Sequence, residues 1–392
     1  MRIALIDPSL FTLPYDRNLA AGLTAIGHDV VLHGRMLRPD DGSSEGVQLA
    51  GDFYRIAGSA TVAAMPPPIR LGIKGLDHAF SMRRLLNRLR REQPGVIHFQ
   101  WLPLPLLDGA LLGRFRAIAP LVLTVHDTNP FNGDPSAGLQ ARGFRRCLAA
   151  FDQLVVHTAQ GKMRLHSLGI PLEKIAVQPH GMLVDPAPGL PDPMSDTLTF
   201  VLFGKIKPYK GPDLLIRAFA ALPNALRQQA KLRIVGKPYM DIRPLQALAA
   251  SHNVALTIEP GFVADEDVPS LYGPATVAMF PYREIEASGV MFLALAHGRP
   301  IIASRLGSFA ELLVDGCHGH LVPPDDIPAL TAAMSHMIAD RGFAKSCAAA
   351  VRSLATDIPD WNEIARRTVQ TYNLAGAPRV AAAGRLMADA AD

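Results

Sequence analysis

The chain lacks the features that mark a secreted, metal-binding or membrane-spanning protein. Its three cysteines, Cys147, Cys317 and Cys347, have no metal-ligand spacing, which favours reduced packing residues in a reducing compartment. No window reaches the roughly 18 uninterrupted apolar residues of a membrane span. The first residues enter a predicted strand at once, so no signal peptide is expected. We therefore expect a cytoplasmic protein, with peripheral attachment to the inner face of the cell membrane left open.

Strong charge and a dinucleotide motif are also missing. The formal net charge of +4 is too weak to imply nucleic acid as a partner. The exits of the first strand in each half read Asp7-Pro8-Ser9 and Gly204-Lys205-Ile206. Neither supplies the Gly-x-Gly-x-x-Gly of a dinucleotide-dependent oxidoreductase, so that class is rejected. With 392 residues, the chain is long enough for two domains, each with its own core.

Short Val/Ile/Leu runs alternate with helical patterns along the whole chain. In the first half they predict strands at Arg2–Asp7, Asp29–Gly34, Val96–Gln100, Leu121–Asp127, Gln153–Thr158 and Lys174–Pro179. In the second half they predict strands at Leu198–Gly204, Lys231–Gly236, Val254–Glu259, Val277–Pro281 and Pro300–Ser304. These runs lack in/out alternation, which indicates buried parallel strands. The predicted fold class is α/β, with two Rossmann-like, doubly wound domains.

The proline-rich segment Met182–Thr197 is the best linker candidate. It separates a predicted N-terminal domain, residues 1–187, from a C-terminal domain, residues 188–360. A helix at 361–376 is expected to follow, with packing against the N-terminal domain as a hypothesis, and then an Ala-rich flexible tail at 377–392. Ligands are expected in a cleft between the carboxyl ends of the two sheets.

Two motifs in the second half carry chemistry. Gly204 permits close backbone approach after a strand, and Lys205 and Lys210 can converge on one anion. Further along, Glu286 precedes a helix that opens at Ser288-Gly289, where free N–H groups and the helix dipole favour a phosphate. A polar loop with solvated lysines and an ordinary capped helix are the alternative interpretations.

Together these motifs resemble the GT4 family of retaining glycosyltransferases, which have the GT-B fold. The family's C-terminal domain shows a Gly-Arg/Lys…Lys-Gly loop, a Glu-x7-Glu segment, and Gly-x-Pro-Val-Ile-Ala-Ser/Thr. This chain has Gly204-Lys205…Lys210-Gly211, Glu286…Leu293, and Gly298 through Ser304 in the same order. The resemblance covers nearly all of 198–340, while the first half matches only in general layout.

The resemblance implies a role for each matching position. The catalytic set is Lys205, Lys210, Glu286 and His126, where the lysines offset charge on the donor diphosphate and His126 faces the donor sugar. The donor-binding set is Gly204, Phe262, Val263, Ser288, Gly289 and Val290. Asp127, Thr128 and Asn129 line the same site in this interpretation, and His98 is left as structural or acceptor-side. The turn His180-Gly181 resembles a family turn and is interpreted as a hinge element.

The chain departs from the family pattern at two places. Leu293 stands where a glutamate normally binds the ribose hydroxyls, so ribose recognition must differ. The first strand's exit lacks the Gly-Gly pair that meets donor phosphates in many members. Its prolines and aromatics indicate a stiffer loop that faces the acceptor, and the weak acceptor-side candidates are Asp7, Tyr15 and Arg17.

Two charged segments have competing interpretations. The triplet Asp265-Glu266-Asp267 resembles a metal-binding Asp-x-Asp, but it directly precedes a predicted helix, where acidic residues cap the N-terminus. We therefore expect no metal and no cofactor. The basic residues Arg83, Arg84, Arg88, Arg90 and Arg91 form either a solvated helix face or a contact with an anionic membrane surface.

The resemblance implies a retaining hexosyltransferase that uses GDP-mannose or UDP-glucose as donor. The expected acceptor is a saccharide, linked to polyprenyl diphosphate, in exopolysaccharide or cell-surface polysaccharide synthesis. Two alternatives stay open at this point. One is a degenerate, non-catalytic GT-B binding partner, an alternative that the missing second glutamate supports. The other is a GT-B sugar-nucleotide epimerase.

Overall fold

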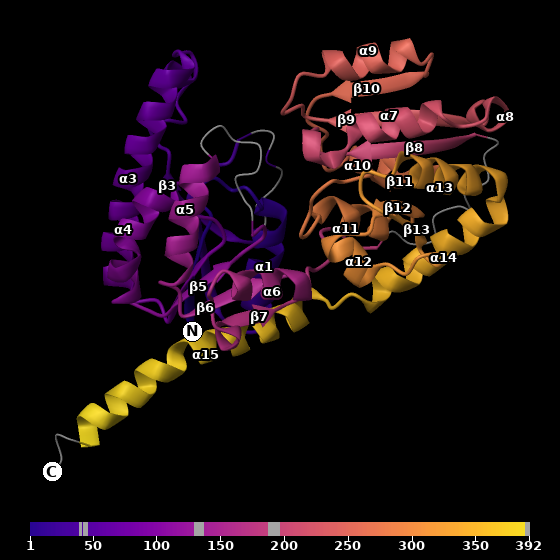
Figure 1. Ribbon diagram of the computed structural model, residues 1–392. Coiled ribbons are helices and arrows are strands. Elements are labelled where there is room, and N and C mark those ends of the chain that lie inside the picture. Colours follow the sequence, from indigo (N-terminus) through magenta and orange to yellow (C-terminus); the bar gives the residue numbers. More distant parts are fainter. Residues whose placement is uncertain (39–40, 42–45, 129–136, 187–196, 389–392) are drawn as a thin grey trace. The chain divides into compact units, whose positions relative to one another are not determined.

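The chain forms two compact units in the computed structural model, which describes all residues except 39–40, 42–45, 129–136, 187–196 and 389–392 (Figure 1). The first unit contains Met1–Gly181 together with Asp360–Asp392, and the second contains Met182–Pro359. The first boundary falls directly after the His180-Gly181 turn. Part of the predicted linker, residues 187–196, lies outside the described residues.

The first unit is built on a parallel sheet of seven strands, counted over the described residues. The strands are β1 (Arg2–Ile6), β2 (Asp29–Arg35), β3 (Gln48–Phe53), β4 (Val96–Phe99), β5 (Leu121–Thr124), β6 (Gln153–Val156) and β7 (Ile175–Val177). Their order in the sheet is β3-β2-β1-β4-β5-β6-β7. The chain therefore reverses its direction of winding between β1 and β4, which is the point where doubly wound sheets bind ligands.

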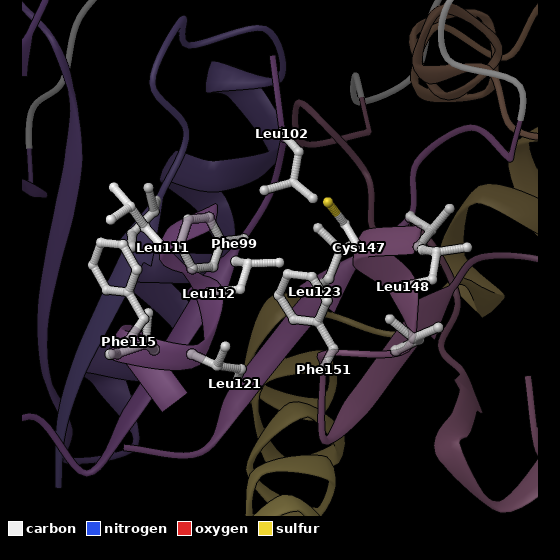
Figure 2. Packing of buried hydrophobic residues seen from close by; sticks show 14 of the residues in the cluster. Phe99, Leu102, Leu111, Leu112, Phe115, Leu121, Leu123, Cys147, Leu148 and Phe151 are labelled. Carbon is white, nitrogen blue, oxygen red and sulfur yellow. The ribbon is translucent and has the colours of Figure 1, made fainter. Parts of the chain in front are cut away.

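Helices cover both faces of this sheet. They are α1 (Leu13–Ala25), α2 (Ala60–Ala63), α3 (Pro67–Glu92), α4 (Pro105–Arg116), α5 (Ala137–Leu148), α6 (Ala159–Ser167) and α15 (Trp361–Ala388), with a 3-10 turn at Leu172–Lys174. The core between β4, β5, α4 and α5 contains Phe99, Phe115 and Phe151, whose side chains are completely buried (Figure 2). This packing removes apolar surface from water and fixes the strand ends that carry polar side chains.

The second unit repeats the same winding. Its strands are β8 (Leu198–Phe203), β9 (Ala230–Gly236), β10 (Leu256–Pro260), β11 (Thr276–Phe280), β12 (Ile301–Ser304) and β13 (Gly319–Val322), in the order β10-β9-β8-β11-β12-β13. All of the recorded pairings are parallel. Its helices are α7 (Pro212–Ala220), α8 (Asn224–Arg227), α9 (Arg243–Ser251), α10 (Val268–Leu271), α11 (Gly289–Ala296), α12 (Gly307–Leu312), α13 (Ile327–Ala339) and α14 (Arg341–Asp357), with a 3-10 turn at Pro208–Lys210.

The last helix, α15, belongs to the first unit although it follows the second in sequence. It packs against α1, β5 and β6. The helix continues to Ala388, through part of the segment predicted as a flexible tail. Alanine has the highest intrinsic helix propensity, so an Ala-rich continuation of a helix needs no cap or core to stay helical locally. No helix in the described part of the chain has the length and apolar character needed to cross a membrane.

The structure adds two strands that the sequence patterns did not predict, β3 and β13. Both lie at an edge of their sheet. In β3 the sequence Gln-Leu-Ala-Gly-Asp-Phe is only partly buried, and β13 begins with glycine and histidine. An edge strand has one neighbour and needs fewer apolar residues, so neither strand shows the apolar run of a central parallel strand.

Candidate functional site

The second unit gathers its predicted site residues at the carboxyl ends of β8 and β11. These two strands are neighbours, and the winding of the sheet reverses between them. The loop after β8 carries Gly204, Lys205 and Lys210, and the loop after β11 carries Glu286 and Ser288. In doubly wound sheets the crevice outside this reversal binds ligands.

Gly204 is the point where these two loops come together. Its φ of +108° lies in a region that L side chains rarely adopt. A Cβ at this position would lie 3.0 Å from Cγ2 of Val290 and 3.1 Å from Nζ of Lys210. The glycine therefore lets the Lys210 ammonium and the first turn of α11 approach the same piece of backbone.

Lys210 is buried and lies between the two loops. Its Nζ is 5.3 Å from the centre of the Tyr282 ring, a residue in the β11 loop. Burial lowers the pKa of Lys210 to about 8, because the charged ammonium is poorly solvated there. A buried ammonium next to a helix N-terminus is suited to an anionic ligand, which restores the charge compensation that burial removed.

The N-cap side chain of helix α11 leaves the first backbone N–H groups of the helix uncapped. Ser288 is the N-cap residue, and its hydroxyl makes no capping hydrogen bond to the helix. Capping by Ser288, the alternative interpretation of this motif, is thus not observed. The first N–H groups of a helix lack intrahelical partners, so the backbone of residues 288–290 can donate to phosphate oxygens.

The backbone of Glu286 is fixed by contacts with the start of α12. Its carbonyl oxygen accepts a hydrogen bond from the N–H of Ser308, 2.8 Å away. A Cβ at Gly307 would lie 2.5 Å from the same oxygen, so glycine is required for this close approach. The Glu286 side chain is itself buried. The start of α12 therefore fixes the position of the residue predicted to contact the sugar.

Lys205, Phe262, Val263 and Leu293 differ in exposure. Lys205 is exposed, with its Nζ 5.9 Å from the ring centre of Tyr239. Phe262 is exposed in the loop after β10, whereas Val263 and Leu293 are half-buried and pack on the apolar cluster beneath α11. The position of Leu293 in this cluster gives it a packing role in place of a hydrogen-bonding one.

The triplet Asp265-Glu266-Asp267 precedes α10, as predicted. Asp267 is the residue before the helix, but its side chain makes no capping hydrogen bond, so the expected capping role of this residue is wrong. Over the described residues, no group of three or more His, Cys, Asp or Glu side chains is arranged to hold a metal ion.

In the first unit, His126 is half-buried and lies in a network of polar side chains at the ends of β4, β5 and β6. Its Nε2 is 3.0 Å from the Gln100 side chain, and its Nδ1 is 3.2 Å from Nε2 of His157. His157 in turn places Nδ1 3.2 Å from the carbonyl oxygen of Gln178. Burial, with smaller contributions from neighbouring histidines, lowers the pKa of His126 well below its usual value.

The hydrogen-bond partners limit where the protons of this network lie. His157 donates from Nδ1 to the Gln178 carbonyl, so Nε2 of the neutral His157 ring is an acceptor. His126 faces an acceptor at each ring nitrogen, Oε1 of Gln100 at Nε2 and Nε2 of His157 at Nδ1, so a neutral His126 ring donates to one of them at a time. Both nitrogens of His126 thus face partners inside the unit, and the ring is held in one orientation.

The side chain of His98 connects these strand ends to α15 through hydrogen bonds. Its Nε2 is 2.8 Å from the Thr124 hydroxyl and its Nδ1 is 2.8 Å from the Tyr372 hydroxyl on α15. The structural alternative for His98 is therefore the one observed. The sequence analysis missed Gln100, His157 and Gln178, whose only signal is their position at the carboxyl ends of predicted parallel strands.

The other predicted residues of this half differ in exposure. Asp7 and Tyr15 are buried, Arg17 is half-buried, and Tyr15 packs edge-on against His126 at 4.9 Å between ring centres. Asp127 is half-buried and Thr128 is buried, while Asn129 lies outside the described residues. The acceptor-side role of Asp7 and Tyr15 stays a prediction. Their burial does not favour it, because a buried side chain is not accessible to an acceptor.

The basic run lies on α3 and divides into two groups. Arg84 donates to the carbonyl oxygen of Asp52, and Arg88 forms ion pairs with Asp52 and Glu92, so these two arginines bind within the unit. Arg83, Arg90 and Arg91 are exposed. Toward the start of the helix, Ile69, Leu76 and Phe80 are also exposed, each by more than half.

Two family models match this chain, and together they cover more than half of it. "Glycosyl transferases group 1" matches residues 197–340 and "Glycosyltransferase Family 4" matches residues 15–185.

A GDP-mannose-dependent alpha-(1-6)-phosphatidylinositol monomannoside mannosyltransferase of Mycolicibacterium smegmatis is 31% identical over 177 residues, which are 43% of this chain and 46% of that protein. A D-inositol 3-phosphate glycosyltransferase of Xylanimonas cellulosilytica is 28% identical over 67% of this chain and 68% of its own length. The alignment thus spans less than half of the first relative.

Solved structures share the fold over almost the whole chain. A sucrose-phosphate synthase from Thermosynechococcus elongatus matches with a TM-score of 0.75 and 20% identity, covering 96% of this chain and 100% of that one. Anabaena HepE, solved in complex with UDP and glucose, matches with a TM-score of 0.71 and 16% identity over 95% and 99% of the two chains. These likenesses confirm the predicted GT-B fold class of two Rossmann-like domains.

Proposed function

Because this chain belongs to the glycosyltransferase family 4, also described as glycosyl transferases group 1, we propose that it transfers a hexose from a nucleotide-sugar to a saccharide acceptor with retention of configuration at the anomeric carbon. The observation that carries the proposal is the convergence of Lys210, Gly204 and the first turn of α11 in the second unit. These groups together suit a diphosphate, the part that nucleotide-sugars share.

In the proposed reaction, the donor's diphosphate departs with the bonding electrons of the anomeric carbon–oxygen bond. Lys205, Lys210 and the N–H groups of residues 288–290 stabilise the charge that develops on it. A departing phosphate oxygen takes the proton of the acceptor hydroxyl, which attacks the same face of the sugar. This route needs no protein nucleophile, so the protein acts by positioning and electrostatics.

Glu286 and His126 have positioning roles in this proposal. Glu286 accepts hydrogen bonds from hydroxyls of the transferred sugar. His126 contributes a neutral ring, because the low pKa that burial gives it prevents protonation near pH 7. A neutral imidazole does not compete with the lysines for the diphosphate. No metal is included, because the lysines and helix α11 supply the positive charge that a metal would provide.

The donor proposal is GDP-mannose or UDP-glucose. The Mycolicibacterium smegmatis relative is named GDP-mannose-dependent, and Anabaena HepE was solved with UDP-glucose, which supports both choices. Phe262 and Val263 lie in the loop after β10 and are proposed to contact the nucleobase. Leu293 cannot accept a hydrogen bond from ribose, so we propose that base and diphosphate contacts carry most of the nucleotide affinity.

The acceptor proposal is a saccharide linked to polyprenyl diphosphate, used in exopolysaccharide or cell-surface polysaccharide synthesis. Support comes from α3. Ile69, Leu76 and Phe80 are seven and four residues apart and therefore share one face of the helix. Arg83 and Arg91 continue that face. An exposed apolar stripe with adjacent arginines suits an anionic membrane surface, where such an acceptor resides.

A thermal-shift panel tests the donor part of the proposal. GDP, UDP, GDP-mannose and UDP-glucose are each added to the full chain, and a ligand that binds the folded state raises its melting temperature. We expect a shift with at least one nucleotide, and loss of that shift in Lys210→Ala. Absence of any shift would contradict the donor site. Release of nucleoside diphosphate that depends on an added acceptor separates a transferase from an epimerase or a non-catalytic binding partner.

A further inference from the structure

Two aromatic side chains lie at the point in the first sheet where the winding reverses. Phe11 is in the loop after β1, and Trp101 is the second residue after the end of β4. Their ring centres are 5.6 Å apart and the ring planes meet at 76°. Phe11 is 50% exposed, so a large apolar ring is presented to solvent at the site where doubly wound sheets bind ligands.

The Trp101 ring is fixed by contacts on its edge and on one face. Its Nε1 donates to the Thr12 hydroxyl, 3.0 Å away. One face stacks on His126, with 5.5 Å between ring centres and 17° between planes. Because His126 is itself held by two neighbouring side chains, the position of the indole is set by β4, β5 and β6 together.

The loop that carries Phe11 is also held in one conformation. The Asp7 carboxylate accepts hydrogen bonds from the backbone N–H groups of Ser9 and Thr12, at 3.2 and 3.1 Å. Leu10, a buried residue, has a φ of +53°, in the left-handed region that a non-glycine residue adopts only at an energetic cost. The loop is therefore held in a strained conformation at Leu10, and the next residue, Phe11, exposes half of its side chain to solvent.

We propose that the exposed ring of Phe11, held by its edge-to-face contact with Trp101, forms a stacking platform for one pyranose ring of the acceptor saccharide. A pyranose has a face of C–H groups and a rim of hydroxyls, and the C–H face packs well on an aromatic ring. The platform rests on the proposed function for the identity of its ligand. Its location beside His126 places the ring of the acceptor next to a residue of the predicted catalytic set, on the unit that does not hold the diphosphate site.

A preformed platform explains why the exposed ring is tolerated. Removing a phenyl ring from water is favourable, and the free protein forgoes the part of this contribution that belongs to the exposed half of Phe11. Ligand binding recovers this contribution without the entropic cost of ordering the loop, because the hydrogen bonds of Asp7 already hold it. A lipid chain would recover the same area on any apolar side chain, whereas a sugar requires the flat aromatic face.

Saturation-transfer NMR with simple glycosides tests this platform on the full chain. The probes are methyl α-D-mannopyranoside, methyl α-D-glucopyranoside, methyl β-D-galactopyranoside and N-acetylglucosamine. We expect ring protons of at least one probe to receive saturation from the wild-type protein and from Phe11→Tyr. Phe11→Ala should bind that probe about three- to tenfold more weakly, because the ligand covers only the exposed half of the ring, and Phe11→Leu should also bind it more weakly because it has no flat aromatic face. Phe11 is half exposed, so all three variants are expected to fold, which circular dichroism verifies.

The outcomes separate the platform from the proposed function. Binding of no probe by the wild-type protein, or unchanged binding by Phe11→Ala, would overturn the platform. Full retention in Phe11→Leu would show a general apolar contact and would overturn it as well. A nucleotide thermal shift measured in the same samples reports on the second unit. A shift without glycoside binding contradicts the platform alone, and glycoside binding without any nucleotide shift contradicts the proposed transferase alone.

Discussion

The hydroxyl of Tyr372 lies 2.8 Å from Nδ1 of His98, and this contact joins residues that are 274 positions apart in the chain. Both side chains are buried. Tyr372 is on α15, which follows the second unit, whereas His98 is on the central strand β4 of the first. The first unit therefore reaches its complete polar network only when the end of the chain has returned to it.

Removing this hydroxyl should destabilise the first unit. Tyr372→Phe keeps the ring but leaves Nδ1 of buried His98 without its hydrogen-bond partner, which costs about 1–3 kcal/mol of unfolding free energy. Urea unfolding monitored by circular dichroism measures the change. The matched control is Leu374→Ala, two residues further on α15 and 58% exposed, which should change the unfolding free energy little. Equal stability of wild type and Tyr372→Phe would show that the contact is not formed in solution.

The buried histidines should make the first unit sensitive to acid. Burial lowers the pKa of His98 and His180 to about 3 and that of His157 to about 4. Below pH 6.5 the unfolded chain binds protons that these folded residues do not, so stability falls as the pH decreases. At pH 5 each of the three contributes a loss of about 2 kcal/mol relative to pH 7.

Asp16 acts in the opposite direction. Burial raises its pKa well above the usual value, with the charge of neighbouring Asp7 adding to the rise, so protonation in the folded state stabilises it as the pH falls. Urea midpoints measured between pH 7.5 and 5 give the net effect, and we expect a decrease. The pKa of His126 is lowered in the same way, so His157→Gln removes one of four such groups and should reduce the slope by about a quarter over this range. A wild-type midpoint that is constant from pH 7.5 to 5 would contradict the burial of the histidines.

The exposed face of α3 should govern binding to anionic vesicles. Phe80→Glu replaces an apolar group that is 61% exposed with a negative charge next to Arg83. We expect about tenfold weaker co-sedimentation with vesicles that contain phosphatidylglycerol, because both the apolar and the electrostatic contributions are reduced. The control is Leu172→Glu, which makes the same charge change at an exposed leucine elsewhere in the first unit. An equal effect of both variants would show that net charge, and not α3, determines the binding.

Parallel strands were the part of the fold that the sequence predicted best. Runs such as Leu121–Thr124 are apolar because helices cover both faces of the sheet, and this signal is local. The order of the strands is not local. The strand β3 is only partly buried at the sheet edge and left no apolar run, and α15 lies in the first unit through contacts with α1 that no local pattern shows.

The same distinction applies to the candidate site. Gly204, Lys210 and Val290 were predicted together from the family pattern, and the structure places them within contact distance around one backbone segment. The partners of His126 could not be predicted in this way. Gln100 and His157 directly follow two different strands, β4 and β6, and they meet His126 only because β4, β5 and β6 are neighbours in the sheet. Tertiary arrangement, and not residue type, makes them part of the site.

Lys210 should make nucleotide binding dependent on pH in the alkaline range. Burial lowers its pKa to about 8, so the ammonium is mostly charged at pH 7.5 and about nine-tenths neutral at pH 9. The neutral amine gives no ionic attraction to a diphosphate. The Kd for GDP or UDP, whichever shifts the melting temperature, should therefore rise by up to about tenfold between these two pH values. Isothermal titration calorimetry in the two buffers measures this change.

Two variants isolate the contribution of Lys210. Lys210→Arg keeps a charge that does not titrate below pH 12, so its Kd should be nearly constant from pH 7.5 to 9. Lys210→Ala should bind weakly at both values and lose turnover while the protein stays folded. Lys205 is exposed and remains in all three proteins, so any pH dependence that it contributes is common to them. A wild-type Kd that is as constant as that of Lys210→Arg would show that the diphosphate does not contact this ammonium.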